Sequence, residues 1–312
     1  MEVPGFAFIR GRVVPYSEAK VGVLNHTLNY GTGVFGGMRG YWSEEDQQLF
    51  VFRPQDHFCR FLESAKMICM NFPVTADHLI ETLTKLLQAE NHRTDCYIRP
   101  FAYFTDESVE GPITVLTPDI SIVAVRFSTS SRSDGLHVTF SSWRRIDDNM
   151  IPARGKIAGA YVNSNLAKSD ALRAGFDDAL LLNTDGHVAE GSTANLFMVR
   201  NGVVITPPVT DNILEGITRR SLMVLLQDEL KCQVDERPID RSEVYLAEEA
   251  FLCGTAVQVA PITRIDYRPL GCGQVGPLTR SVQMLYAEVV RGGVKKYRQW
   301  CMPVYTTGAV AR

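Results

Sequence analysis

The sequence predicts an α+β protein in two domains, and three observations support this fold class. Strand and helix patterns are mixed along the chain without the regular strand–helix–strand alternation of a parallel sheet. The chain has 312 residues, which is enough for two modest domains. Its most polar, turn-forming stretch is residues 128–135, which we expect to be an interdomain linker. We therefore expect a small N-terminal domain at residues 1–127 and a larger C-terminal domain at residues 136–312.

The first domain is expected to be rich in strands. Alternating apolar residues predict strands at residues 6–9, 13–14, 34–41, 49–52, 97–104 and 120–127. Apolar residues at helical spacing predict helices at residues 55–70 and 75–90. The second helix begins at Thr75, a favourable N-cap residue, and carries four leucines on one face.

The second domain continues with a run of strands joined by Asp-Gly and Asn-Gly turns, which favour antiparallel hairpins. Strands are expected at residues 136–143, 179–183, 195–200 and 203–206, and around Val234 and Phe251. Helices are expected at residues 161–174, 218–230 and 277–291. Gly175 is expected to end the first of these helices as a C-cap.

Composition excludes several classes of function. The net charge is −3 and basic clusters are absent, which argues against a nucleic-acid partner. No apolar run approaches the length of a membrane span, and the N-terminus lacks the features of a signal peptide. The seven cysteines include no C-x-x-C pair, so we expect reduced thiols, no metal site and a cytoplasmic location.

Two features suggest chemistry when they are considered without any comparison. Lys156 lies in a loop of small residues, where an amine can form a Schiff base with an aldehyde; a solvated surface lysine is the alternative. Gly216 and Thr218 lie at the start of a predicted helix, where backbone N–H groups bind anions, although many ordinary helices start this way. Glu190 lies just past a hairpin turn, and taken alone this position suggests an ordinary surface carboxylate.

Eight short motifs occur in a fixed order along the chain. They are NYGTGVF at 29–35, HFCRFLESAK at 57–66, YIRP at 97–100, KIAGAYVNS at 156–164, DALLLNTDG at 178–186, EGSTANLF at 190–197, GITR at 216–219 and GTA at 254–256. Together they resemble the fold-type IV enzymes that depend on pyridoxal 5′-phosphate (PLP), and within them the branched-chain aminotransferases. The resemblance covers roughly residues 6 to 292.

The resemblance implies two α/β-type domains with PLP at their interface, and it implies roles for the motif residues. Lys156 corresponds to the catalytic lysine that forms the Schiff base with PLP. Glu190 corresponds to the partner of the pyridine nitrogen, and Tyr161 to the partner of the phenolic oxygen. The phosphate is expected to be bound by Arg60, Gly216, Ile217, Thr218 and Thr255.

The resemblance also implies a substrate pocket and an activity. The pocket residues are expected to be Tyr30, Phe35, Gly37, Arg39, Tyr97, Arg99, Thr255 and Ala256. The implied reaction is transamination between L-leucine, L-isoleucine or L-valine and 2-oxoglutarate, giving branched-chain 2-oxo acids and L-glutamate. A homodimer is expected to be the smallest active unit, with the loop at residues 106–118 covering the pocket of the partner subunit.

The chain departs from the family pattern around the pocket. Gly36 stands where the family usually has glutamate. Residues 127–132 are Phe-Ser-Thr-Ser-Ser-Arg where the family often has Phe-Pro-Trp-Gly-x-Tyr, and residues 257–261 also differ. The alternatives on the same fold are D-amino-acid aminotransferases, (R)-amine transaminases and aminodeoxychorismate lyases. An alternative of a different class is a non-catalytic module that binds a phosphate ligand.

Overall fold

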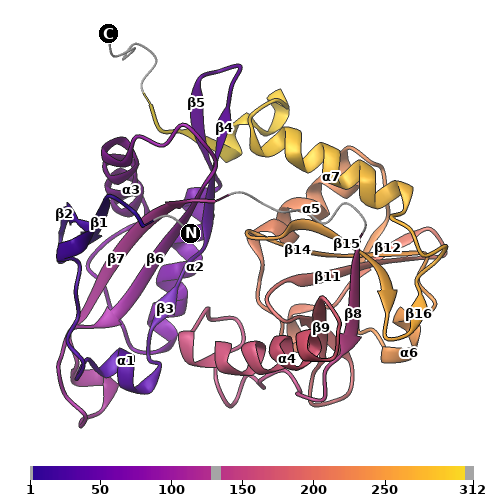
Figure 1. Ribbon diagram of the computed structural model, residues 1–312, viewed down its shortest axis with the longest axis horizontal. Helices are drawn as coiled ribbons and strands as arrows, with labels where there is room; N and C mark the ends of the chain where they lie inside the picture. Colours follow the sequence, from indigo (N-terminus) through magenta and orange to yellow (C-terminus); the bar gives the residue numbers. More distant parts are fainter. Residues whose placement is uncertain (1–2, 128–134, 306–312) are drawn as a thin grey trace. The chain divides into compact units, whose positions relative to one another are not determined.

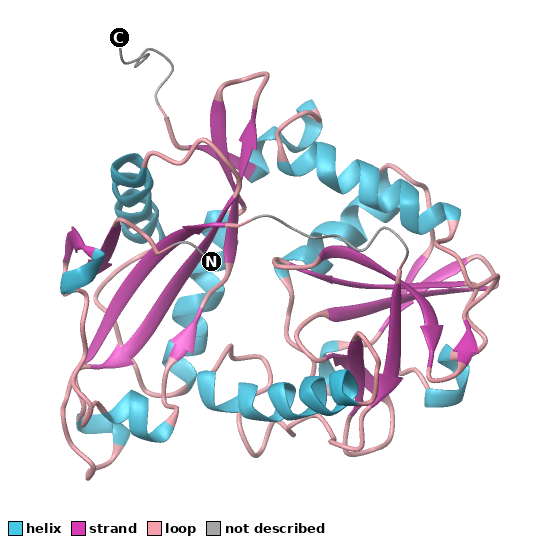
Figure 2. Cartoon of the chain, in the orientation of Figure 1, coloured by secondary structure: helices cyan, strands magenta, loops and turns pink. Residues whose placement is uncertain are grey.

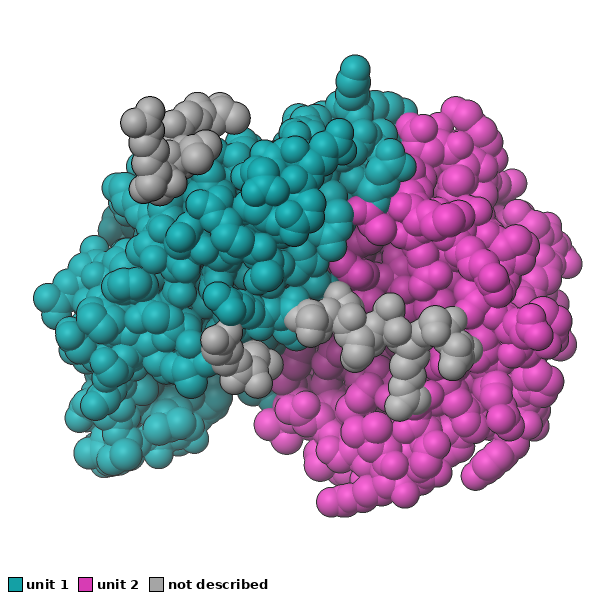
Figure 3. Space-filling view, turned by 45° about the horizontal axis from the view of Figure 1, so that its top comes forward, with its two compact units in different colours: residues 1–128, 155–159, 288–312 teal, residues 129–154, 160–287 magenta. Residues whose placement is uncertain are grey.

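The computed structural model describes residues 3–127 and 135–305, and it is an α+β structure built on two sheets (Figures 1 and 2). The chain forms two compact units, coloured separately in Figure 3. Unit 1 comprises residues 1–128, 155–159 and 288–312, and unit 2 comprises residues 129–154 and 160–287. The predicted α+β class is confirmed.

The domain boundaries expected from the sequence remain a prediction, and the compact units differ from them in two places. Residues 155–159 and 288–312 belong to unit 1, although both lie in the C-terminal part of the chain. The reason is strand pairing: Ile157 bridges to Val34, and strand β17 (Cys301–Pro303) pairs with strand β5 (Gln48–Phe52). The predicted linker at 128–135 lies outside the described residues, apart from Gly135.

Among the described residues, the sheet of unit 1 has eight strands in the order β17-β5-β4-β6-β7-β1-β2, with β3 paired to β6. Besides β5 and β17, this sheet contains β1 (Phe6–Ile9), β2 (Arg12–Pro15), β3 (Val34–Phe35), β4 (Met38–Ser43), β6 (Cys96–Phe104) and β7 (Pro118–Arg126). All of these pairings are antiparallel. The six strands predicted for the first domain are therefore all present, and the one predicted at 34–41 is divided into β3 and β4.

Helices α2 (Pro54–Met67) and α3 (Ala76–Glu90) pack together beside this sheet, α2 against β3 and α3 against β1 and β7 (Figure 1). The predicted N-cap is confirmed, because Thr75 Oγ1 accepts a hydrogen bond from the backbone of His78. The short helix α1 (His26–Tyr30) was not predicted. Asn25 caps it through the backbone of Leu28, and Gly31 ends it in a left-handed conformation.

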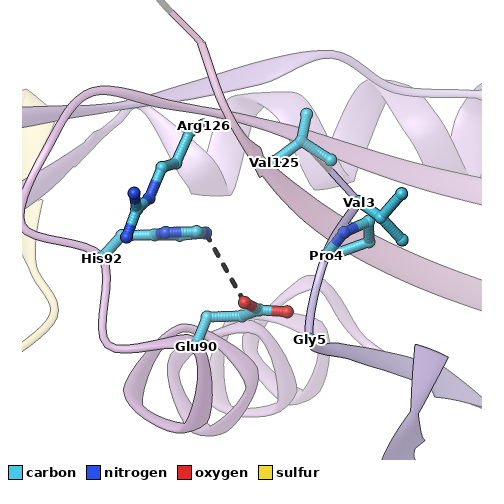
Figure 4. A pocket seen from close by; sticks show the side chains of 7 residues that line it. All are labelled: Val3, Pro4, Gly5, Glu90, His92, Val125 and Arg126. Atoms are coloured by element: carbon cyan, nitrogen blue, oxygen red, sulfur yellow. Dashed lines mark ion pairs between the residues drawn. The ribbon is translucent and has the colours of Figure 1, made fainter. Parts of the chain in front are cut away.

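The end of α3 anchors the beginning of the sheet. Glu90 Oε1 accepts a hydrogen bond of 2.6 Å from the backbone of Phe6, the first residue of β1. Figure 4 shows the surrounding polar pocket, in which His92 Nε2 lies 3.9 Å from Glu90 Oε2. None of the predicted site residues lines this pocket, so we interpret it as a structural contact that positions β1.

Among the described residues, the sheet of unit 2 has nine strands in the order β10-β9-β8-β15-β14-β11-β12-β13, with β16 paired to β15. These strands are β8 (Leu136–Phe140), β9 (Asp178–Leu182), β10 (Val188–Gly191), β11 (Asn195–Arg200), β12 (Val203–Thr206), β13 (Val234–Glu236), β14 (Glu249–Gly254), β15 (Gln258–Ile265) and β16 (Arg268–Pro269). The pairs β8–β9, β8–β15 and β12–β13 are parallel. Central strands such as β14 are buried on both faces, which removes the alternation that a sequence search would detect.

The helices of this part of the chain are α4 (Tyr161–Arg173), α5 (Ile217–Asp228), α6 (Arg241–Val244) and α7 (Pro277–Val290). The three predicted helices are confirmed within a few residues. Helix α4 contacts β9, and α5 contacts β13 and β14. Apolar side chains of β8, β9, β11, β14 and β15 contribute to the main core of this unit. No helix in residues 3–127 or 135–305 combines the length and apolar character that crossing a bilayer requires.

Candidate active site

Four of the predicted site residues lie together in unit 1, around the buried ring of Phe35. The Arg99 guanidinium carbon lies 4.4 Å from the centroid of that ring, and Lys156 Nζ lies 4.9 Å from it. Arg99 also donates a hydrogen bond of 3.1 Å to the hydroxyl of Tyr97. Two cations and two aromatic rings thus converge from segments that are far apart in the sequence.

The backbone of Lys156 is fixed by strand-like contacts with β3. Its carbonyl accepts a hydrogen bond of 3.0 Å from Phe35, and the next bond runs from Ala158 to Gly33 at 2.7 Å. The backbone N–H of Lys156 donates to Ser64 Oγ in α2 at 3.2 Å. Ser64 Oγ in turn donates to the carbonyl of Arg60 at 2.7 Å, so Arg60 and Lys156 are linked through one side chain.

Two glycines explain how the aromatic residues fit beside this cluster. A Cβ atom on Gly37 would lie 2.2 Å from the Tyr97 hydroxyl, so glycine is required for Tyr97 to occupy its position. A Cβ atom on Gly36 would lie 2.5 Å from the ring of Pro100. The glutamate that the family usually has at position 36 would therefore need the Pro100 ring to move.

Two other predicted pocket residues, Arg39 and Tyr30, contact residues that were not predicted to line the pocket. Arg39 is 1 % exposed, its Nη2 lies 3.4 Å from Asp95 Oδ2, and its guanidinium packs on Tyr41. Asp95 is also paired with Arg291 at 2.9 Å. This burial and pairing support a structural role for Arg39 rather than the predicted substrate contact. Tyr30 is half exposed at the end of α1, and its hydroxyl donates to the carbonyl of Val109 at 2.7 Å.

Glu190 is a buried carboxylate on β10 in unit 2, not the surface residue that its local sequence suggests. Its Oε1 is paired with Arg145 Nη2 at 3.1 Å. Its Oε2 accepts hydrogen bonds from Asn195 Nδ2 at 2.8 Å and from the backbone of Leu214 at 3.3 Å. A buried carboxylate needs such compensation to remain charged, so the geometry holds Glu190 as an oriented anion.

The start of helix α5 has the chemistry of a phosphate site. Its N-cap is Gly216, which offers no side-chain cap, and the following Ile217 and Thr218 are buried. A Cβ atom on Gly216 would lie 2.0 Å from Asn195 Oδ1, so the backbone can approach Asn195 only because the residue is glycine. The N–H groups of a helix start, with the positive end of the helix dipole, favour an anion. Unit 2 therefore contains suitable partners for both ends of PLP, a carboxylate for the ring nitrogen and a helix start for the phosphate.

The remaining predicted residues of unit 2 lie at the ends of elements. Tyr161 is the half-buried first residue of α4. Thr255 and Ala256 form the turn between β14 and β15, and Ala256 is exposed.

Cys253 comes just before this turn, and complete burial raises the pKa of its thiol. We therefore expect the thiol to stay neutral and not to act as a nucleophile.

Comparison with known proteins identifies the family. A sequence model of class IV aminotransferases matches residues 33–265. The chain is 46% identical over 301 residues to a probable branched-chain-amino-acid aminotransferase of Aquifex aeolicus, covering 96% of this chain and 97% of that protein. It is 34% identical over 302 residues to the branched-chain-amino-acid aminotransferase of Escherichia coli K12, covering 95% and 96%. The chain belongs to the class IV aminotransferase family.

Solved structures agree with this assignment. The branched-chain aminotransferase of Thermoproteus uzoniensis with norvaline has a TM-score of 0.93 and 40% identity, covering 97% of this chain and 100% of that one. The PLP form of the enzyme from Thermobaculum terrenum has a TM-score of 0.94 and 38% identity, covering 98% and 100%. The predictions of a fold-type IV fold, of PLP as cofactor and of an aminotransferase are confirmed, and the roles of individual residues remain predictions.

Three residues that the structure places at these sites were not predicted from the sequence. Asn195 lies in the EGSTANLF motif, five residues after Glu190, and its position in that hairpin was the only available signal. Ser64 lies in the HFCRFLESAK motif, one helical turn after Arg60. No sequence pattern pointed to Arg145, because this residue lies in an irregular segment far in sequence from Glu190.

Replacing Arg60 with alanine should weaken PLP retention more than it slows the cofactor-saturated enzyme. A charge-assisted hydrogen bond to phosphate contributes about 1.5–3 kcal/mol, so the PLP dissociation constant should rise about ten- to a hundredfold. Equilibrium dialysis against PLP measures the change. Lys66→Ala is the matched control, since it removes an exposed positive charge from the same helix. An unchanged dissociation constant in Arg60→Ala would argue against the phosphate role.

Proposed function

We propose that this PLP-dependent aminotransferase transfers amino groups between L-leucine, L-isoleucine or L-valine and 2-oxoglutarate. The observation that carries the proposal is the cluster of Phe35, Tyr97 and Arg99 around the Lys156 amine, which pairs an apolar wall with a guanidinium. The names of the relatives at 46% and 34% identity support the same reaction. The products are branched-chain 2-oxo acids and L-glutamate.

The proposed cofactor roles follow from the chemistry of the residues. When bound, PLP supplies an electron-withdrawing ring that stabilises negative charge at the substrate α-carbon. The Lys156 amine would move the proton between the substrate α-carbon and C4′ of the cofactor. Glu190, a buried anion, keeps the ring nitrogen protonated, and the Tyr161 hydroxyl binds the phenolic oxygen. Arg60, Thr255 and the start of helix α5 (Gly216, Ile217 and Thr218) bind the phosphate.

Aromatic side chains are proposed to bind the side chain of the substrate, and polar groups are proposed to bind its carboxylates. The rings of Tyr30, Phe35 and Tyr97 contact the branched side chain, with Gly37 making room for the Tyr97 hydroxyl. Arg99 binds the distal carboxylate of 2-oxoglutarate. In the described part of the chain no carboxylate pairs with Arg99, and its Nε is buried without a hydrogen-bond partner. The backbone of Thr255 and Ala256 receives the α-carboxylate.

A steady-state panel of donors and acceptors tests the substrate assignment. L-leucine, L-isoleucine and L-valine should each be active with 2-oxoglutarate, because the cluster offers an apolar wall and a cation for the second carboxylate. The opposing arm of the panel uses D-amino acids and an (R)-amine with pyruvate. If L-leucine with 2-oxoglutarate is inactive while that arm turns over well, the chain is a D-amino-acid or (R)-amine transaminase.

We also propose that the protein acts as a homodimer in the cytoplasm. Large apolar side chains are exposed on two neighbouring segments, Val23 and Leu28 before and in α1, and Val109 and Val115 in the loop at 106–118. The Tyr30–Val109 hydrogen bond joins these two segments. An apolar cavity lined partly by Val21 and Leu28 lies in the same region. Apolar surface of this kind is typical of an interface, and we infer that a second copy covers it.

The dimer is tested by a charge placed in this apolar region. Leu28→Asp should shift the protein from dimer to monomer in sedimentation velocity, because burying the aspartate at an interface requires removing its hydration. Met284→Asp is the matched control, as Met284 is similarly exposed on α7. A monomeric wild type would contradict the proposal, and so would a Leu28→Asp variant that stays dimeric.

A further inference from the structure

Arg145 is the charged partner of Glu190, and its own position is tightly constrained. Its side chain is 8% exposed, and Nη2 lies 3.1 Å from Glu190 Oε1. Its Nε donates to the carbonyl of Asn212 at 3.1 Å, and its backbone N–H donates to the carbonyl of Leu182 at 2.8 Å. These contacts fix the guanidinium where its Nη2 is paired with Glu190 Oε1.

The opposite oxygen of Glu190 is fixed by neutral donors. Asn195 Nδ2 is shared between Glu190 Oε2 at 2.8 Å and the carbonyl of Leu214 at 2.9 Å. The backbone N–H of Leu214 donates to the same oxygen. Asn195 and Leu214 thus determine where the carboxylate lies, whereas among these partners only Arg145 brings a positive charge.

We propose that Arg145 is a positioning residue that determines where the proton between Glu190 and the cofactor ring resides. The proposal rests on the proposed role of Glu190 as partner of the pyridine nitrogen. A guanidinium at 3.1 Å stabilises the ionised carboxylate relative to the protonated acid. With Arg145 present, the proton stays on the ring nitrogen. Without that cation, the buried carboxylate binds a proton more readily, so the proton moves from the ring nitrogen toward Glu190.

The location of this proton can be measured directly, without an activity assay. The holoenzyme is reconstituted with PLP labelled with ¹⁵N in the ring, and the ¹⁵N chemical shift distinguishes a protonated from an unprotonated pyridine nitrogen. Arg145→Met keeps a long side chain and removes the charge, so its signal should move toward the unprotonated value. Arg145→Lys restores a cation and should return the signal toward that of the wild type. The amino-acid half-reaction of Arg145→Met should slow about tenfold, the factor for one unit of proton affinity.

Arg144 provides a matched control. It is the preceding residue and also an arginine, but it is exposed and its Nη1 donates to the carbonyl of Asn183. Arg144→Met should leave the ¹⁵N signal unchanged. In a Glu190→Gln background no carboxyl group remains for Arg145 to control, so adding Arg145→Met should then produce no further shift. This non-additivity separates control of the proton from a general loss of structure.

The outcomes distinguish this proposal from the proposed function. A wild type that fails to retain PLP or to transaminate contradicts the function itself. A wild type that does both, with an unchanged ¹⁵N signal in folded Arg145→Met, overturns the role of Arg145. An equal shift in the wild-type and Glu190→Gln backgrounds overturns it as well. If Arg145→Met does not fold, Arg145→Gln keeps a polar head group without the charge and allows the same comparison.

Discussion

Replacing Lys156 with alanine should lower transamination by a factor on the order of 10²–10⁴ or more, because the variant loses both the covalent attachment and the proton carrier. Borohydride reduction of the wild-type holoenzyme should trap a pyridoxyl group on Lys156, identified by peptide mass mapping. The reduced Lys156→Ala variant should instead release its cofactor on denaturation. Its absorption spectrum before reduction should correspond to the free aldehyde.

The chain has eight lysines, so mapping the position of the adduct tests the assignment to Lys156. Lys85→Ala is a suitable control, since Lys85 is an exposed residue of α3. It should retain both the adduct on Lys156 and normal turnover. An adduct on any other lysine of the wild type would disprove the site assignment, whatever the activity of the variants.

The second large effect is expected from Glu190→Gln, which should retain PLP but slow the amino-acid half-reaction about a hundredfold or more. Glutamine preserves the shape and can still accept a hydrogen bond from Asn195, but it cannot hold a proton on the pyridine nitrogen by charge. It also leaves Arg145 buried without its anion, so a lower Tm is expected. Rapid mixing with L-leucine under single-turnover conditions measures the rate of the half-reaction directly.

Glu215→Gln provides the comparison for this prediction. Glu215 lies one residue before Gly216, is paired with Arg154 near the surface and is substantially exposed. Losing that surface pair should have little effect on the half-reaction. Turnover of Glu190→Gln within a few-fold of the wild type would mean that Glu190 is not the partner of the ring nitrogen.

Most secondary structure in this protein could be predicted from local sequence. Helices α2, α3, α4, α5 and α7 have apolar stripes or caps that a short window reveals, and their observed limits differ from the prediction by a few residues. The short elements α1, α6, β10, β16 and β17 were missed, because two to five residues have too little pattern to stand out. Strand β15 was also missed, although it is longer, because it contains Pro261 and a proline argues against a central strand.

The candidate site could likewise be predicted from the sequence only in part. The motifs identify Lys156, Glu190 and the start of α5 as chemically important, because the residue types at those spacings suit one cofactor. The same motifs give no information on burial, and they suggest a substrate contact for Arg39. In the structure, Arg39 is instead an almost fully buried partner of Asp95, a residue in a different segment of the chain.

The sequence by itself determined the α+β class, the principal helices, the family and the cofactor, because each of these depends on residues close together in the chain or on motifs in a fixed order. The tertiary structure decided the hydrogen-bond and charge partners of the site residues. Ser64 joins Lys156 across a separation of 92 residues, and Arg145 joins Glu190 from a segment with no recognisable motif. The grouping of residues 155–159 with unit 1 likewise depends on backbone pairing with β3. Such contacts depend on which strands pair and which side chains are excluded from water, and both are properties of the folded chain as a whole.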